Sequence, residues 1–334
     1  MGSSPTPGTR VISASRRTDL PRWYLPWLAG ALRAGEATIA LPYGGQRTVS
    51  LRPEHVHTLV LWSKDFSLLL AERGVRKLLA RYDQITAQFT VTGLGGGPLE
   101  PGVPPPEEAL EQLPRLVNLC GSPHRVTVRF DPIVHWWAKG RIASNIPWAE
   151  SVFRACARHG IRDLRTSFAT LYGKVQRRPV RWYDPSAAER GRIAADLRDL
   201  ARLYRLDIAA CSDPSLEAAG IPRKGCIDGR GLSSLHPRGT AASLRRDRGQ
   251  RRDCLCTESV DIGSYTMRCP GGCLYCYAQP ALSRTNGRAH RPMRTRPPGP
   301  TAERRPSAPP NPGSGSGTAR TPLPPRDGDG TGSS

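Results

Sequence analysis

Segment 58–91 has the sequence TLVLWSKDFSLLLAERGVRKLLARYDQITAQFTV, and its pattern indicates the fold class. Runs rich in β-branched and other apolar residues at 58–62 and 85–91 predict two strands. Between them, the apolar residues of 66–80 recur at helical spacing, which predicts a helix. A strand, a helix and a second strand in this order predict a parallel β-α-β unit.

The same alternation continues on both sides of this segment. Further strands are predicted at 10–14, 38–41, 125–130, 163–167 and 206–210, and further helices at 21–33, 106–119, 148–158 and 186–204. About six such units suit either a partial (β/α) barrel or a doubly wound sheet. We favour an α/β fold with a partial (β/α) barrel, because polar residues recur directly after the strands, where barrels form their sites.

Composition divides the chain into four parts. Residues 1–9 are predicted to be a disordered N-terminus, and 10–211 to form the partial barrel. Residues 212–283 are rich in loops and cysteines and are predicted to pack on the barrel as a closing segment. Residues 284–334 are rich in Pro, Gly and Arg and are predicted to be a disordered tail, because they have few apolar side chains to bury.

The chain is strongly basic, with 49 Lys and Arg against 28 Asp and Glu and a formal net charge of +21. Such a charge indicates a nucleic-acid or other polyanionic partner. Nearly all the basic residues are Arg, which a GC-rich coding sequence also produces, so codon bias is an equal alternative. The chain lacks an apolar run of about eighteen residues and its first ten residues lack a signal-peptide core, so we expect a cytoplasmic protein with no membrane partner.

Three of the nine cysteines occur as Cys269-Pro-Gly-Gly-Cys273-Leu-Tyr-Cys276, a C-x3-C-x2-C spacing. In a reducing compartment, so many cysteines indicate metal ligands rather than disulfides. Thiolates select iron–sulfur clusters or zinc, and structural zinc usually takes paired C-x2-C units with four ligands. The spacing therefore favours a [4Fe–4S] cluster with one iron left open; a zinc knuckle or free thiols are the alternatives.

This motif resembles the signature of the radical S-adenosylmethionine (SAM) superfamily, with Tyr275 as the aromatic residue before the last cysteine. The local C-x-Y-C-Y run, which ends at Tyr277, is similar to that of spore photoproduct lyase-like enzymes. The resemblance implies a partial (β/α)6 barrel and SAM on the fourth iron of the cluster. It also implies Tyr275 as a cofactor-binding residue, a reductant such as a flavodoxin or ferredoxin, and a 5′-deoxyadenosyl radical that removes a substrate hydrogen.

The order of motifs along the whole chain resembles a bacterial family of unknown function, number 1848 in the domain-of-unknown-function series. The resemblance covers about residues 10–280 and rests on VISASRRTDLP, LWSKD, FTVTGLG, VRFDPIV, CSDPSLEAAGIPRKGCIDG and CLCTESVDIGSYTMRCPGGCLYCYA. In the radical SAM superfamily the cysteine motif follows the first strand, whereas here it follows the last. The family resemblance implies the cluster and the fold but no reaction.

Two further groups of residues are candidates for cofactor binding. The resemblance to radical SAM enzymes implies that glycines after strand 85–91 help to bind the SAM amino group, and a flexible loop is the alternative; these glycines are Gly93, Gly95 and Gly96. A possible second metal site, with an iron–sulfur cluster or zinc, is formed by Cys211, Cys226, Cys254 and Cys256. Its alternative is core packing, which we expect for Cys120 and Cys156.

The candidates for substrate binding follow the predicted strands: Ser15, Arg16, Arg17, Lys64, Arg129 and Asp131. Two adjacent Arg at the mouth of a barrel suit a carboxylate or phosphate, and an ion pair with Asp19 is the alternative. Arg129 and Asp131 point to the same side of a strand, so an internal ion pair is the alternative there. The sequence does not identify catalytic residues or the substrate.

Three hypotheses for the function follow. The leading one is an uncharacterised iron–sulfur protein that acts as a radical SAM-like enzyme. A non-catalytic metal-binding or electron-transfer protein with a fully ligated cluster is the second. A nucleic-acid-acting protein of repair or modification is the third, suggested by the basic charge and by the lyase-like run.

Overall fold

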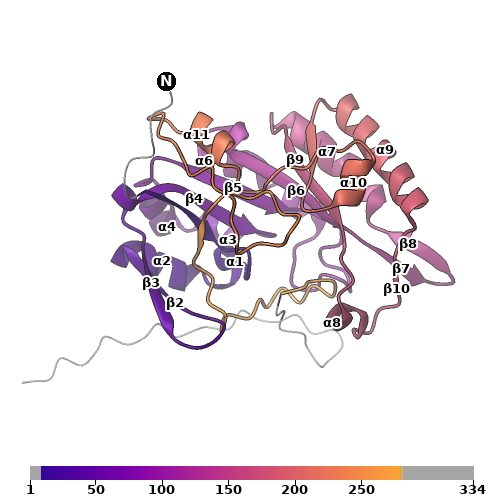
Figure 1. Ribbon diagram of the computed structural model, residues 1–334, viewed down its shortest axis with the longest axis horizontal. Coiled ribbons are helices and arrows are strands. Elements are labelled where there is room, and N and C mark those ends of the chain that lie inside the picture. The colour runs from indigo at the N-terminus through magenta and orange to yellow at the C-terminus, as the bar shows by residue number, and fades with distance from the viewer. Residues whose placement is uncertain (1–8, 279, 281–334) are drawn as a thin grey trace, which may run out of the picture. The chain divides into compact units, whose positions relative to one another are not determined.

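A seven-stranded sheet organises the computed structural model, which describes residues 9–278 and 280 (Figure 1). Every neighbouring pair of its strands is parallel, as the sequence predicts. Its order is β12 (Val260–Asp261), β1 (Arg10–Ala14), β4 (Val56–Ser63), β5 (Ile85–Thr90), β6 (Val126–Ile133), β9 (Asp163–Phe168) and β11 (Asp207–Ala210). Within the described residues β11 and β12 do not pair, so the sheet is open.

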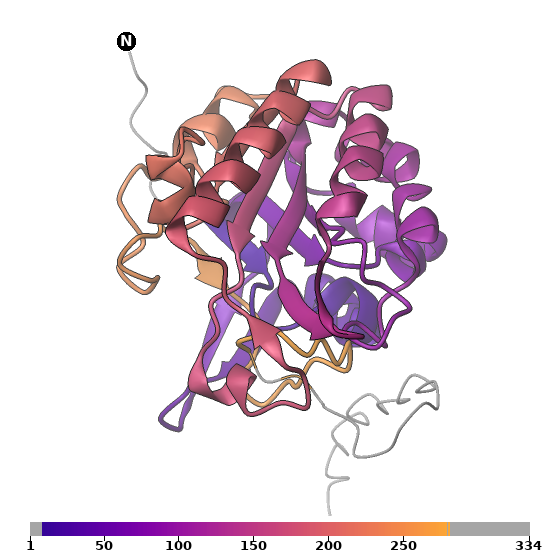
Figure 2. The same cartoon turned by 90° about the vertical axis from the view of Figure 1, so that its right-hand side faces the viewer.

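Helices lie between these strands in the predicted alternation. They are α1 (Leu20–Trp23), α2 (Leu25–Ala34), α3 (Ser67–Ala71), α4 (Arg73–Leu79), α5 (Pro106–Leu110), α6 (Leu113–Cys120), α7 (Ala149–Arg158) and α9 (Ala187–Leu203). Short helices α8 (Gly173–Gln176), α10 (Pro214–Ala218) and α11 (Gly229–Ser234) follow β9 and β11. Figure 2 shows α7 and α9 covering one face of the sheet. None of the described helices has the length and apolar character to cross a membrane.

Three of the predicted helices, 21–33, 66–80 and 106–119, are each broken in two. The break in 66–80 falls at Glu72, whose backbone is extended and whose side chain accepts a hydrogen bond from the Gly74 N–H at 3.2 Å. The other two second halves each have a proline in their first turn, Pro26 and Pro114. Proline lacks an N–H and fits the first turn of a helix better than its interior, so it starts a new helix.

The strand predicted at 38–41 does not belong to the main sheet, which corrects its place in the alternation. It forms β2 (Glu36–Ala40), which pairs antiparallel with β3 (Gln46–Ser50) in a separate hairpin. Gly44 and Gly45 have positive φ and form its turn. A third sheet, also not predicted, joins β10 (Trp182–Tyr183), β7 (His135–Ala138) and β8 (Arg141–Ser144).

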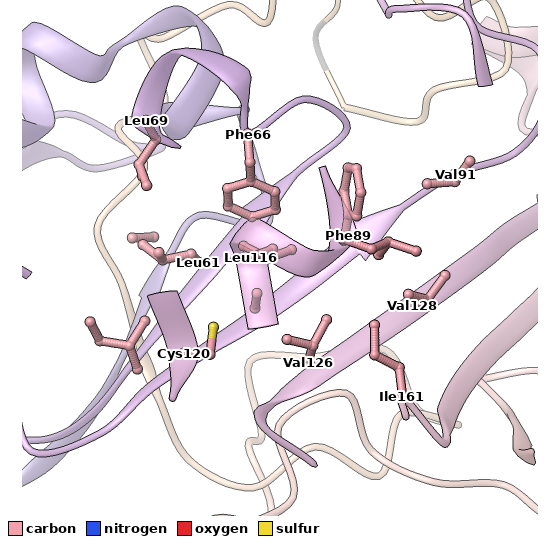
Figure 3. Packing of buried hydrophobic residues seen from close by; sticks show 14 of the residues in the cluster. Leu61, Phe66, Leu69, Phe89, Val91, Leu116, Cys120, Val126, Val128 and Ile161 are labelled. Carbon is pink, nitrogen blue, oxygen red and sulfur yellow. The ribbon is translucent and has the colours of Figure 1, made fainter. Parts of the chain in front are cut away.

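The main core lies between the sheet and the helices. Figure 3 shows part of it, where Leu61 and Phe89 from the strands meet Phe66 and Leu116 from the helical layer. The rings of Phe66 and Phe89 pack edge to face with centroids 5.4 Å apart. Cys120 and Cys156 are buried in this core, as predicted. The predicted disorder at 1–8 and 284–334 concerns residues outside the described part of the chain.

Candidate metal centre

A cavity of about 270 Å³ lies at the carboxyl ends of the parallel strands. Its walls come from the later residues of β4, β5, β6 and β9, from residues that follow β1, β4, β5, β9 and β11, and from the chain on either side of β12. Both predicted groups of cysteines line it: Cys269, Cys273 and Cys276, and Cys211, Cys226, Cys254 and Cys256. The structure therefore brings together in one cavity cysteines that are far apart in the sequence.

The pairing of β12 with β1 explains why the C-terminal motif reaches this cavity. Val260 is in register with Ile12 and Asp261 with Ser13 in a parallel ladder. Because parallel strands end at the same edge of a sheet, the chain after β12 leaves beside the end of β1. Figure 2 shows this orange segment beyond the arrowheads of the strands.

Glycines turn the loop that carries the first group of cysteines. Gly272 has a φ of +66°, a conformation that favours glycine. A Cβ placed on Gly271 would lie 3.4 Å from the Sγ of Cys269 and 4.0 Å from the Sγ of Cys273, so both sulfurs flank one point. The Cys276 N–H donates to the carbonyl of Cys273 at 3.1 Å and closes the turn.

A loop after β5 holds the cysteine loop by its backbone. The Gly102 N–H donates to the carbonyl of Gly271 at 3.1 Å, and the Leu274 N–H donates to the carbonyl of Leu99 at 2.9 Å. A Cβ on Gly102 would lie 2.9 Å from the Cα of Gly271, so glycine is required for this close approach. The glycine-rich loop therefore positions the cysteines.

Arg178, which sequence reasoning missed, binds the other side of the cysteine loop. Its guanidinium donates to the carbonyl oxygens of Cys273 at 3.3 Å and of Cys276 at 2.6 Å, and also to that of Leu274. One planar group with several N–H donors can satisfy three carbonyls in this way. The polar backbone of the loop is thus tied to the protein.

The three thiols of this loop are buried, and burial disfavours their charged form. Burial raises the pKa of Cys269 to about 11, and it raises the pKa values of Cys273 and Cys276 too. Nearby negative groups add to the shift at Cys269 and Cys273. Metal ligation requires thiolates, so binding here must supply positive charge and release protons.

The described residues do not gather three His, Cys, Asp or Glu side chains around one point, as a single metal ion would require. The thiolates of a cubane cluster bind different irons, so the cluster itself keeps them apart. None of the nine cysteines forms a disulfide.

A buried hydrogen-bond network connects Lys64 and Tyr275 to Glu100, a residue that the sequence did not indicate. Lys64 Nζ lies 2.8 Å from both Glu100 Oε1 and the Tyr275 hydroxyl. The Tyr275 hydroxyl and Thr92, at 2.7 Å, also donate to Glu100, which is 1% exposed. Burial opposes the charge of Lys64, but Glu100 and Cys273 together raise its pKa. Lys64 and Tyr275 therefore both line the cavity of the thiols, held by a carboxylate 175 residues from Tyr275.

Asp261 fixes the residues that follow β1. Its carboxylate accepts hydrogen bonds from Ser13 Oγ at 2.8 Å, Ser15 Oγ at 2.6 Å, the Arg16 N–H at 2.9 Å and Arg17 at 3.2 Å. The acidic partner of Arg17 is thus Asp261, which corrects the alternative that an ion pair with Asp19 holds these arginines. Ser15, Arg16 and Arg17 all line the cavity.

Asp19 has a different role, at the start of α1. It caps this helix by accepting from the Arg22 N–H at 3.0 Å, and it accepts from Ser63 Oγ at 2.7 Å and the Lys64 N–H at 2.9 Å. Burial raises its pKa to about 6. Asp19 therefore ties the end of β4 to the helix that follows β1.

Arg129 and Asp131 form an internal ion pair, the alternative that their position on the same side of the strand predicts. Both line the cavity. Arg129 also donates from Nη1 to the Sγ of Cys226 at 2.7 Å. Its guanidinium lies 5.4 Å from the centre of the Trp62 ring, and so does that of Arg16. The ion pair therefore does not exhaust the donors of Arg129, which face the second group of cysteines.

Gly93, Gly95 and Gly96 are not among the residues that line the cavity. A Cβ on Gly93 would lie 2.2 Å from Trp148, and one on Gly95 would lie 1.9 Å from the carbonyl oxygen of Pro104. In the described structure these glycines allow the loop to pack closely on Trp148 and on its own residues. That loop reaches the cavity further along, at Gly102.

Comparison with known proteins gives one family. The family model described as a domain of unknown function (DUF1848) matches residues 11–278, which confirms the family resemblance seen in the sequence. No curated protein matches the chain. The matched region includes both groups of cysteines and every residue that lines the cavity.

Proposed function

The chain belongs to the domain-of-unknown-function family DUF1848, and we propose that it is a radical SAM-like enzyme with a [4Fe–4S] cluster on Cys269, Cys273 and Cys276. One observation carries the proposal: these three thiols line a cavity at the carboxyl ends of a parallel sheet. Sites of α/β folds form at that edge. The proposed substrate enters the same cavity.

The strand order supports the finer assignment of a partial (β/α) barrel. From β1 to β11 the strands of the main sheet follow the order of the chain, as they do in a barrel. The motif of the radical SAM superfamily follows the first strand, and here it follows β12, the parallel neighbour of β1. A segment that comes last in the chain thus occupies a position next to the one that the superfamily uses.

The residues around the thiols fit a cluster. Soft thiolate donors suit iron–sulfur chemistry, and the hydrogen bonds of Arg178 and Gly102 fix the loop without using the sulfurs. Lys64 places a positive charge beside Cys273 and Cys276, where cluster thiolates would carry negative charge. Three ligands leave one iron open for SAM.

With SAM bound and a one-electron reductant such as a flavodoxin or ferredoxin, such a cluster supplies a 5′-deoxyadenosyl radical that removes a hydrogen atom from the substrate. The protein's part is to enclose and orient the substrate. Arg16 and Arg17 offer guanidinium donors on one side of the cavity, next to Ser15, and the Arg129–Asp131 pair offers charges of both signs. These groups favour a polar or anionic substrate.

Electron paramagnetic resonance tests the proposal after anaerobic reconstitution with iron and sulfide. The reduced protein should give a cluster signal that changes when SAM is added. The combined Cys269→Ala, Cys273→Ala and Cys276→Ala variant should lose the SAM-sensitive signal. Cys120→Ala, which alters a cysteine buried in the main core, is the matched control and should retain it.

Two results would overturn the proposal. A cluster signal of which no component responds to SAM would favour the electron-transfer alternative, since a fully ligated cluster has no open iron. Uptake of zinc in place of iron, with no sulfide bound, would indicate that the three thiolates form a structural zinc site instead of a cluster.

A further inference from the structure

The second group of cysteines converges from three separate segments of the chain. Cys211 follows β11, Cys226 lies in the loop after α10, and Cys254 and Cys256 precede β12. The Sγ atoms of Cys211 and Cys226 lie 3.1 Å apart. Cys256 lies beside Cys226, because the N–H of the next residue, Ile227, points to the Sγ of Cys256 at 3.4 Å. Cys254 is two residues before Cys256, and all four cysteines line the same cavity.

The backbone is built to bring these segments together. A Cβ on Gly225 would lie 2.6 Å from the carbonyl oxygen of Leu255 and 3.0 Å from the Cα of Cys256, so only glycine allows this approach. The Ile227 N–H points to the Sγ of Cys256 at 3.4 Å, and the Thr257 N–H donates to the carbonyl of Ile227 at 2.9 Å. The segment that carries Cys226 is therefore fastened to the segment that carries Cys256.

Buried arginines surround the four sulfurs. Arg129 reaches Cys226 at 2.7 Å and Cys211 at 3.7 Å, and both Arg16 and Arg165 act on Cys226 or Cys256 through their charge. Arg165 is 1% exposed. Each of the three is paired with a carboxylate, Arg129 with Asp131, Arg165 with Asp163 and Arg16 with Asp247, so it is their remaining N–H donors that face the sulfurs.

Several buried donors in this region have no acceptor within the described residues. They are Nη2 of Arg16, Nε1 of Trp62 and Nε of Arg165. Arg16 and Trp62 line the cavity beside the cysteines. Buried polar groups normally have hydrogen-bond partners, so these donors indicate an anionic occupant with several acceptor atoms.

From these contacts we propose that Cys211, Cys226, Cys254 and Cys256 bind a second iron–sulfur cluster, separate from the one on the C-x3-C-x2-C motif. Four thiolates and bridging sulfides supply the acceptors that the unpartnered N–H groups of Arg16, Trp62 and Arg165 lack. A single zinc ion on the same four thiolates is the alternative, and the sulfide content distinguishes it from a cluster. A disulfide between Cys211 and Cys226 would leave Cys254 and Cys256 unexplained.

This cluster would have a protein ligand for each of its four thiolate positions, so it has no site for SAM. It borders the same cavity as the first group of cysteines. A closed cluster in that position suits electron transfer to or from a molecule in the cavity. The inference concerns a different set of ligands, so it holds or fails independently of the proposed enzyme function.

The test uses the variant that lacks the first group, Cys269→Ala with Cys273→Ala and Cys276→Ala. After anaerobic reconstitution it should retain about half of the iron and acid-labile sulfide of the wild-type protein and a reduced-cluster signal indifferent to SAM. Failure of this variant to bind any sulfide, while it remains folded by circular dichroism, would overturn the proposal.

The converse variant replaces Cys211, Cys226, Cys254 and Cys256 by Ser. It should lose the SAM-indifferent signal and keep the signal of the first group, whereas the joint control Cys120→Ala with Cys156→Ala should keep both. Iron and sulfide contents equal to those of wild type would contradict the proposal. If the four-fold variant does not fold, Gly225→Val replaces it as the converse test, because it changes no ligand and should selectively lower the SAM-indifferent signal. An unchanged signal in that variant would equally contradict the proposal.

Discussion

The backbone N–H of Gly102 donates to the carbonyl of Gly271 at 3.1 Å, and the two glycines pack without space for a side chain between them. Gly271 lies between Cys269 and Cys273, with the sulfurs of both close to it. The loop after β5 thus sets the position of the candidate cluster ligands. The predictions below start from this contact.

Gly102→Ala should lower the iron content of the first site while the protein still folds. The new Cβ would meet the Cα of Gly271 at 2.9 Å and the carbonyl oxygen of Pro270 at 3.0 Å, so the cysteine loop must shift. Iron per chain and the SAM-sensitive signal measure the effect. Gly30→Ala in α2 is the control, since its Cβ has no neighbour within 4 Å; it should retain iron and gain about 0.5–1 kcal/mol in free energy of unfolding. Equal iron in both variants would show that the contact does not position the ligands.

Glu100→Gln should lower the free energy of unfolding by about 3 kcal/mol, because it leaves the ammonium of Lys64 buried without its anionic partner. Urea denaturation of the reconstituted protein measures this loss. Asp199→Asn removes the partner of Arg202 in an exposed pair and should cost less than about 1 kcal/mol. A small effect at Glu100 would mean that water reaches Lys64.

Arg178→Lys should speed the loss of iron to a chelator. A lysine ammonium lacks the planar, fixed set of N–H donors with which the guanidinium binds the carbonyls of Cys273, Leu274 and Cys276. The rate of iron release, followed by absorbance, is the measurement. The neighbouring Arg177→Lys changes an exposed side chain and should release iron at the wild-type rate. Matching rates in the two variants would assign the loop's stability to other contacts.

The stability of the protein should fall as pH drops below about 6.5, the unfolded-state pKa of histidine, partly because of His57 and His236. Their rings lie 4.5 Å apart, and burial lowers the pKa of each in the folded state. The unfolded chain then binds more protons than the folded chain between the two pKa values, so acid favours unfolding. Asp83 and Arg238 face this pair with opposite charges.

Denaturation midpoints between pH 7.5 and pH 5 measure this dependence. His236→Gln should flatten the fall in stability below pH 6.5, because it removes one group and the repulsion on the other. The matched control is His124→Gln, which alters a histidine outside this pair and should leave the slope unchanged. A slope that is the same in all three proteins would exclude the pair as its source.

The alternation of short β-branched runs with helical patterns predicted the main sheet well. Those patterns are local, and β1, β4, β5, β6 and β9 each overlap a predicted strand. The strand at 38–41 was assigned to the wrong sheet because its hairpin partner, β3, is largely exposed and polar and gives little hydrophobic signal. The breaks at Glu72 and before Pro114 depend on single residues, whereas the helical spacing of apolar residues is judged over a longer stretch and does not show them.

The candidate site was predictable as far as its cysteines, whose spacing is visible in the sequence. Its supporting residues were not. Glu100 and Arg178 are ordinary charged residues in loops, and each acts on a partner far away in the chain. The sequence around Glu100 does not indicate that its side chain accepts a hydrogen bond from Tyr275. Only the packing of the sheet defines such contacts.

The parallel pairing of β12 with β1 bears on how the protein is made. Ser13 and Asp261 are joined by a hydrogen bond across 248 positions of sequence. During synthesis β1 emerges early, yet one of its edges has no partner until almost the whole described chain has followed. Contacts between residues so far apart in the sequence form slowly. The nascent protein therefore has an unpaired strand edge, open to aggregation, over a long interval, and the proposed cluster would be loaded only after translation.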